Sequence, residues 1–154
     1  MRFARVLHLV AAICLGDMLL LVPVAAAKGD APGIAQVKTV SGQVVVVRGG
    51  ARLAAKVGDP LFEKDTVETG TDGSIGITFV DNTVMSTGPD SAIGLDEFRF
   101  DSSNFNGAML MDMHKGTVSV VSGDIARSSP NAMKVKTPTA ILGVRGTRFV
   151  IEVR

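Results

Sequence analysis

Residues 74–86 read Ser-Ile-Gly-Ile-Thr-Phe-Val-Asp-Asn-Thr-Val-Met-Ser, and this stretch carries the clearest signal for the fold. Successive side chains of an extended chain point to opposite faces, so Ile75, Ile77 and Phe79 share one face. Asp and Asn at 81–82 tolerate turn conformations and stand between two apolar runs. The stretch therefore predicts an antiparallel hairpin with a two-residue turn and one buried face.

The chain after residue 27 repeats this pattern of short β-branched runs. Gly, Asp, Asn and Pro separate the runs at intervals of about ten residues, which is typical of all-β domains. No stretch keeps helical spacing of apolar residues long enough to predict a helix, and the polar segment 101–107 is expected to be a loop. The predicted strands are 36–40, 43–48, 66–69, 74–80, 83–86, 92–100, 108–114, 117–122, 133–137 and 148–153.

These strands predict a single all-β domain over residues 28–154. A glycine stands just before a β-rich run three times, at Gly42, Gly116 and Gly146. Short strands separated by glycine-containing turns suit either a twisted, solenoid-like course or an irregular sandwich, and the sequence leaves both open.

Residues 1–27 have the composition of a secretory signal peptide. Arg2 and Arg5 precede an apolar run that ends in Ala25-Ala26-Ala27, the pattern of a cleavage site. The alternative is an uncleaved anchor, since residues 6–27 are long enough to span a membrane. We expect the mature chain to be periplasmic or secreted, with membrane contact only through this segment if it is uncleaved.

Composition excludes several classes of function. Subtracting Arg2, Arg5 and Asp17 leaves 14 basic and 14 acidic residues, so no basic surplus supports nucleic-acid binding. The mature chain has no Trp or Tyr, which argues against stacking platforms for bases. Its one cysteine, Cys14, lies within residues 1–27, so neither a disulfide framework nor a cysteine-ligated zinc site is expected.

Four segments, taken together and in order, resemble the periplasmic domain of the FecR family of regulators. The resemblance covers about residues 37–153 and implies an all-β domain with a twisted, solenoid-like course. The segments are 40–44 (VSGQV), 57–70 (VGDPLFEKDTVETG), 72–83 (DGSIGITFVDNT) continued by 88–91 (GPDS), and 137–147 (TPTAILGVRGT).

The resemblance also implies a role in protein contacts. In the namesake regulators this domain relays a signal from an outer-membrane siderophore transporter to a cytoplasmic sigma factor. Only five residues precede the apolar run here, and the sequence stops at Arg154. We therefore expect neither a sigma-binding region nor a second subdomain that docks a transporter.

The segment 137–147 is the densest candidate site. Pro138, Gly143 and Gly146 suit a tight crossover in which backbones approach closely. Arg145 is expected to bind loop carbonyls or a carboxylate such as Asp59 or Asp81. The functional alternative is anion capture by Arg145 and nearby backbone N–H groups, and the structural interpretation is favoured.

Met109, Met111 and Met113 alternate along one predicted strand and so share a face. Thioethers suit Cu(I), but methionine also fills irregular cores. Same-face neighbours on a strand lie about 6.6 Å apart, which is wide for shared coordination. Core packing is favoured over a copper site, and no cofactor or metal ligand is assigned.

Catalytic candidates are weaker still. His114, the only mature histidine, would need Asp112 as its orienting carboxylate and an unassigned serine. The acidic pairs Glu63/Asp65 and Asp96/Glu97 stand in polar, turn-like contexts with nothing to separate their pKa values. We therefore expect no enzyme and assign no catalytic residue.

The leading hypothesis is an exported, non-catalytic module that mediates protein–protein contacts in envelope signalling or scaffolding. Its final strand, 148–153, is expected to leave an unpaired edge that a partner strand completes. The alternative is a periplasmic binder of a small ligand or Cu(I), and a third hypothesis is a truncated product with no independent role. The sequence names neither the signal, the partner nor the oligomeric state.

Overall fold

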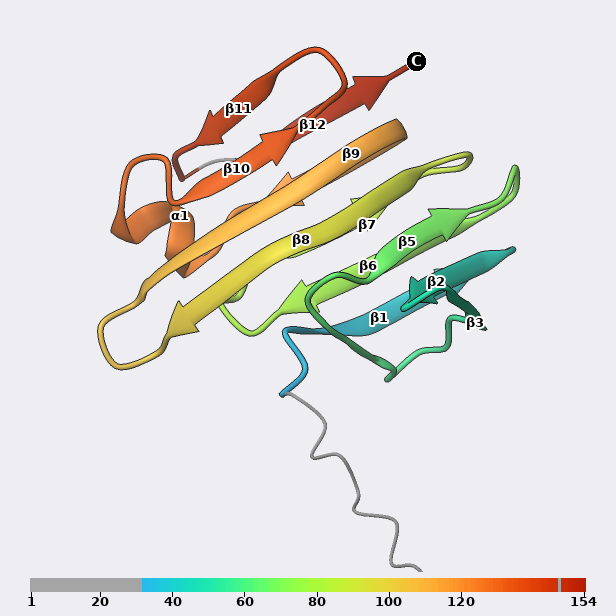
Figure 1. Ribbon diagram of the computed structural model, residues 1–154, viewed down its shortest axis with the longest axis horizontal. Coiled ribbons are helices and arrows are strands. Elements are labelled where there is room, and N and C mark those ends of the chain that lie inside the picture. Colours follow the sequence, from blue (N-terminus) through green and yellow to red (C-terminus); the bar gives the residue numbers. More distant parts are fainter. Residues whose placement is uncertain (1–31, 147) are drawn as a thin grey trace, which may run out of the picture. The chain divides into compact units, whose positions relative to one another are not determined.

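The computed structural model describes residues 32–146 and 148–154 (Figure 1). This part of the chain is an all-β domain with one short helix, so the predicted fold class is confirmed. The predicted signal peptide, 1–27, lies outside the described residues. The elements are β1 Ala35–Ser41, β2 Val44–Arg48, β3 Ala51–Ala54, β4 Pro60–Leu61, β5 Thr66–Thr69, β6 Ser74–Phe79, β7 Val84–Thr87, β8 Ala92–Asp101, β9 Asn106–Val121, α1 Asp124–Ser128, β10 Met133–Lys136, β11 Ile141–Val144 and β12 Arg148–Val153.

The long strand β9 organises the sheet (Figure 1). Its first half lies between β8 and β10, and its second half lies between β7 and β12. On one side the sheet continues from β8 through β5 and β2 to β3, and on the other from β7 through β6 and β1 to β4. Because one strand belongs to both halves, the sheet curls upon itself into a half-barrel.

Gly116 explains why two predicted runs, 108–114 and 117–122, form one strand. Its φ is +92°, a conformation that side-chain-bearing residues rarely adopt. A Cβ at this position would lie 2.2 Å from Ser91 Oγ, so the close approach also requires glycine. The sequence predicts separate strands on either side of this glycine, but here it changes the direction of β9 without interrupting it.

The core lies between the two halves of the curled sheet. The rings of Phe79 on β6 and Phe98 on β8 stack with centroids 5.7 Å apart, joining the two inner faces. The predicted alternation on β6 is confirmed, because Ile75, Ile77 and Phe79 are all buried. Burial of such side chains, each worth about 1.5–3 kcal/mol, is the main force that holds the domain together.

The hairpin between β6 and β7 differs from prediction by one residue. Phe79 N donates to Thr83 O at 2.8 Å, which leaves residues 80–82 as a three-residue loop rather than two. Asn82 takes a φ of +64°, the left-handed conformation that a three-residue hairpin requires.

Four elements were not predicted: β3, β4, β11 and α1. All four residues of β3 are exposed, and β4 has only two residues. Neither segment therefore shows the alternation of apolar and polar residues that predicts a strand. The five-residue α1 is too short to show helical periodicity. It lies in the crossover that brings β10 back parallel to β9, a pairing that needs such a connection.

Candidate functional site

Within the candidate segment 137–147, residues 137–144 form the turn and second strand of the β10–β11 hairpin rather than the predicted tight crossover. Thr137 N donates to Ala140 O at 2.8 Å, so the turn at Pro138 is short, and β11 follows it. β11 pairs antiparallel with β10, with Val135 opposite Leu142. The sequence missed this strand because its first three residues are exposed and show no alternation. Residue 147 lies outside the described part of the chain.

Arg145 does not bind the carboxylates expected for it. Asp59 accepts a hydrogen bond from Lys56 N at 2.8 Å, and Asp81 accepts from Thr83. Arg145 is exposed and makes no ion pair with any residue that the structure describes. It lies just beyond β11, beside the start of β12.

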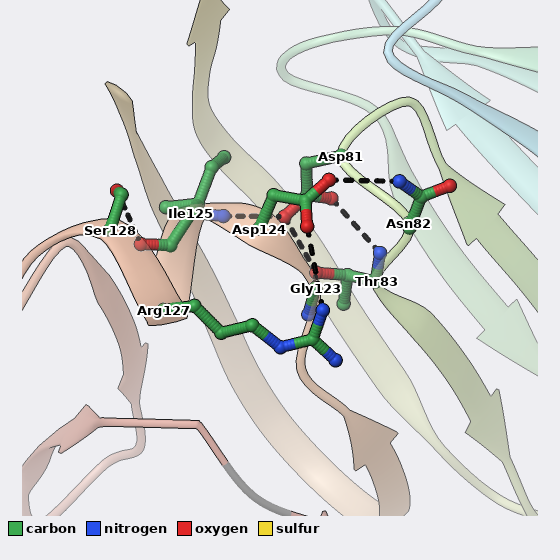
Figure 2. A network of polar contacts seen from close by, with 8 residues as sticks. All are labelled: Asp81, Asn82, Thr83, Gly123, Asp124, Ile125, Arg127 and Ser128. Atoms are coloured by element: carbon green, nitrogen blue, oxygen red, sulfur yellow. Dashed lines mark hydrogen bonds and ion pairs between the residues drawn. The ribbon is translucent and has the colours of Figure 1, made fainter. Parts of the chain in front are cut away.

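Asp81 instead fixes the position of the crossover (Figure 2). Its buried carboxylate accepts from Thr83 N at 3.1 Å, Thr83 Oγ1 at 2.8 Å and Ile125 N at 3.4 Å. Its backbone carbonyl accepts from Asp124 N at 2.8 Å, and Gly123 N donates to Thr83 Oγ1 at 2.9 Å. These bonds tie the β6–β7 turn to α1, which in turn places the β10–β11 hairpin.

A groove separates β11 from β12. One cavity of about 280 Å³ lies toward Arg145, and a second of about 360 Å³ lies toward the turn at Pro138. Leu142 and Ile151 line both cavities, so the two are neighbours along the groove. The remaining apolar lining includes Val144 and Phe149, and it comes from both halves of the sheet.

The strand β12 leaves one edge unpaired. Among the described residues it is hydrogen-bonded to β9 alone, with Ile151 opposite Val118, which confirms the predicted free edge. Thr117 directs its N–H to Ser91 Oγ and its carbonyl to Gly88 N, both on the side of β7. Backbone groups of successive residues on a strand point to opposite sides, so the N–H and carbonyl of Val118 point toward β12. Ile151, which lies opposite Val118, therefore directs its N–H and carbonyl toward β9. The N–H of its neighbour Val150 then faces the free edge.

The exposed side chains of β10, β11 and β12 are both apolar and basic. Ile141 is 66% exposed and Val150 is 65% exposed, large values for aliphatic residues on strands. Lys134 and Arg148 are also exposed. The arrangement offers backbone hydrogen bonds, apolar contact area and positive charge to an extended chain.

The methionine row is part of the core. Met109, Met111 and Met113 are each at most 2% exposed, and Met133 of β10 lies opposite Met109. The core-packing interpretation is therefore confirmed. None of the three thioethers lines either groove cavity, so the copper alternative gains no support.

Asp112 pairs with a lysine rather than acting on His114. Its carboxylate lies 2.6 Å from Lys136 Nζ on β10 and 3.9 Å from His114 Nδ1. The hydrogen bond and negative charge of Asp112 raise the pKa of Lys136 above its ordinary value, with a smaller contribution from the charge of Asp96. The contact is thus a structural link between β9 and β10.

Asp65 is also structural: it closes the expected turn, in which Asp65 N donates to Phe62 O at 3.2 Å, but its carboxylate is buried. Its carboxylate is 1% exposed and accepts from Arg48 Nε and Nη2, both at 2.8 Å, and from Phe62 N at 2.8 Å. Glu63 is exposed, and its nearest charge is Lys64 at 3.9 Å. The two carboxylates therefore do not form an acid–base pair.

The pair Asp96 and Glu97 lies at an irregularity in β8. The register with β9 shifts between Leu95 and Glu97, which leaves Asp96 as the extra residue of a bulge. Glu97 binds Arg99 on the same strand. A bulge explains why two successive acidic residues fit within a long strand.

Comparisons with known proteins agree with this architecture. Residues 65–154, more than half of the chain, match the family model described as FecR protein. The two earliest resembling stretches, 40–44 and most of 57–70, precede the matched region. No curated protein and no solved structure matches the chain.

Two further features of the described residues bear on the site. Within 32–146 and 148–154, no cluster of three or more His, Cys, Asp or Glu side chains could hold a metal ion. No helix in the same residues is long and apolar enough to cross a membrane.

Proposed function

The chain belongs to the FecR protein family, and from this premise we propose that it is an exported, non-catalytic module that binds another envelope protein. The family is a regulatory one concerned with signalling. In this proposal the protein serves envelope signalling or scaffolding by adding a strand of its partner to the edge of β12.

The observation that carries the proposal is the free edge of β12 beside the apolar groove. An unpaired edge presents a row of N–H and C=O groups to any extended chain, and proteins usually blunt such edges. Here the exposed residue at the centre of β12 is Val150. Its side chain carries no charge that would repel an added strand and is too small to cover the edge. Strand addition gives affinity through the main chain, and neighbouring pockets give specificity through alternate side chains.

The groove would supply those pockets. Leu142, Val144, Phe149 and Ile151 line it. A strand added to β12 would direct every second side chain into this apolar space.

The roles of the acidic residues support a non-catalytic module. Asp65 and Asp112 are each engaged by a cation, Arg48 and Lys136 respectively. Pairing of this kind links neighbouring strands and leaves neither of these two carboxylates free to exchange protons with a substrate.

The proposed location is the periplasm or the exterior of the cell. The charged start, apolar run and Ala-Ala-Ala ending of residues 1–27 support export. In the uncleaved alternative the same segment tethers the module to the membrane.

A crosslinking pair tests the proposal. A photo-reactive amino acid replaces Val150 in one variant and Val57 in the other, since these valines are 65% and 64% exposed. Irradiation in the producing cells should yield a discrete adduct with an envelope protein from position 150 only. Equal adducts from both positions, or none from position 150, would rule out docking at the β12 edge.

A further inference from the structure

The charges of the chain are divided unevenly along its length. Residues 125–154 contain six basic residues and one acidic residue, a net charge of +5. Residues 28–124 contain eight basic and 13 acidic residues, a net charge of −5. Such a division steers oppositely charged partners to one end of a protein.

Three of the six basic side chains are already paired. Arg127 binds Asp124, Lys136 binds Asp112, and Arg154 binds Glu152. Within the part of the chain that the structure describes, the other three make no ion pair. They are Lys134, Arg145 and Arg148.

Of these three unpaired cations, Arg145 lines the groove at the end of β11, and Arg148 begins β12. Lys134 on β10 lies opposite Gly143 on β11, and Arg145 follows two residues later. Arg148 is the first residue of β12, and Arg145 follows the last residue of β11, so these two cations lie near the start of β12.

We infer that the partner segment runs antiparallel to β12 and carries acidic residues at its C-terminal end. This inference rests on the proposed function. An antiparallel strand ends opposite the start of its neighbour, so its last residues would lie beside Arg148 and Arg145. Antiparallel addition repeats the pairing of β12 with β9 and is slightly more stable per residue.

A second copy of the chain fits the edge less well. It would bring another segment of net charge +5 to the same place, and like charges oppose association. Its one acidic side chain there, Glu152, already binds Arg154. An acidic partner instead supplies the missing counter-charges.

Two fluorescent peptides of identical composition test the direction. One reads Ser-Val-Thr-Val-Ser-Val-Asp-Asp and the other has the reverse order, both with blocked ends. Fluorescence anisotropy with the purified chain should show the first peptide binding about tenfold more tightly, a preference that falls with added salt. Equal binding, tighter binding of the reversed peptide, or no binding of either would overturn the inference.

Charge variants supply the control. The double variant Arg145→Gln, Arg148→Gln should lose the preference between the peptides, whereas Lys115→Gln, an exposed cation on β9, should keep it. Urea unfolding of each variant separates lost recognition from lost folding. If Lys115→Gln abolishes the preference as fully as the double variant does, the assigned cations are wrong.

Two other occupants are outcomes of the same experiment. Binding to phosphatidylcholine vesicles that depends on added phosphatidylglycerol, and on Arg145 and Arg148, would show that the site binds an anionic membrane and not an acidic protein segment. A dimer that is seen by analytical sedimentation and is dissociated by Val150→Pro would show that the edge of β12 binds a second copy of the chain. Crosslinking confined to position 150, together with no peptide preference, would overturn the acidic partner and leave the proposed function standing.

Discussion

Leu142 of β11 and Ile151 of β12 line the same groove, although their strands attach to different halves of β9. β11 reaches the first half of β9 through β10, whereas β12 bonds directly to the second half. The bend at Gly116 separates these two halves. The open groove is therefore a consequence of one bent strand serving both sides of the sheet.

Hydrogen exchange should alternate along β12. The amides of Phe149, Ile151 and Val153 bond to β9, while those of Arg148, Val150 and Glu152 face the free edge. In the unbound protein we expect the second set to exchange much faster than the first, because bonded amides exchange only after opening. Amide exchange followed by NMR measures this, and uniform protection along β12 would show that its edge is covered.

The ion pair between Arg48 and Asp65 should contribute strongly to stability. Asp65→Ala leaves the Arg48 guanidinium without its buried carboxylate and Phe62 N without its acceptor. Loss of one partner from a buried pair costs about 3–5 kcal/mol, and the 38% exposure of the Arg48 side chain favours the lower end.

A second ion pair in the same region supplies the control. Arg52 and Glu68 lie 2.8 Å apart, but their side chains are 61% and 37% exposed. Glu68→Ala should change the free energy of unfolding by no more than about 1 kcal/mol. Urea denaturation compares the two variants, and equal losses would contradict the assigned burial.

Thr87→Val should stabilise the protein. The buried Thr87 Oγ1 has no hydrogen-bond partner within the described residues, and valine has nearly the same shape. Removing an unsatisfied hydroxyl should raise the free energy of unfolding by about 1 kcal/mol. Thermal or urea unfolding measures the change.

Thr83→Val is the matched contrast. Its hydroxyl donates to Asp81 and accepts from Gly123 N, so the substitution leaves both groups short of a partner (Figure 2). We expect a loss of about 1–3 kcal/mol. The same sign of change in both valine variants would refute the hydrogen-bond assignment at one of these positions.

The contact between Lys136 and Asp112 should make stability depend on alkaline pH. The pKa of Lys136 is raised in the folded state by the hydrogen bond and charge of Asp112. Its contribution is therefore fully present below the unfolded pKa of about 10.4 and is lost as pH rises through the higher folded value.

The variant Asp112→Asn isolates this effect. It removes the cause of the raised pKa, so the Lys136 ammonium should titrate at lower pH than in the unmodified chain. NMR of the lysine side chain detects the difference. An unchanged titration would mean that the two groups do not interact in solution.

Local patterns in the sequence were enough to predict much of the fold. The alternation of Ile75, Ile77 and Phe79 gave the correct buried face, and Met109, Met111 and Met113 were correctly placed in the core. Both predictions rest on a period of two within a few residues, which tertiary contacts did not override.

The groove could not be predicted, because it depends on contacts between distant residues. β11 is a strand through its pairing with β10, and the parallel pairing of β10 with β9 depends on the crossover that contains α1. The role of Asp65 likewise depends on Arg48, 17 residues away. No short pattern in the sequence signals such pairings, and for the same reason Arg145 was assigned the wrong carboxylates.

The most direct test of partner binding at β12 compares two substitutions of one residue. Val150→Pro removes the free-edge N–H without removing a bond to β9, whereas Val150→Thr keeps both the N–H and the β-branched shape. Chemical crosslinking in the producing cells, with recovery of the tagged chain, measures the captured envelope partner for each variant. The account predicts capture by Val150→Thr at the unmodified level and its loss in Val150→Pro, with equal amounts of exported, folded protein. Undiminished capture by Val150→Pro would contradict binding through the edge of β12.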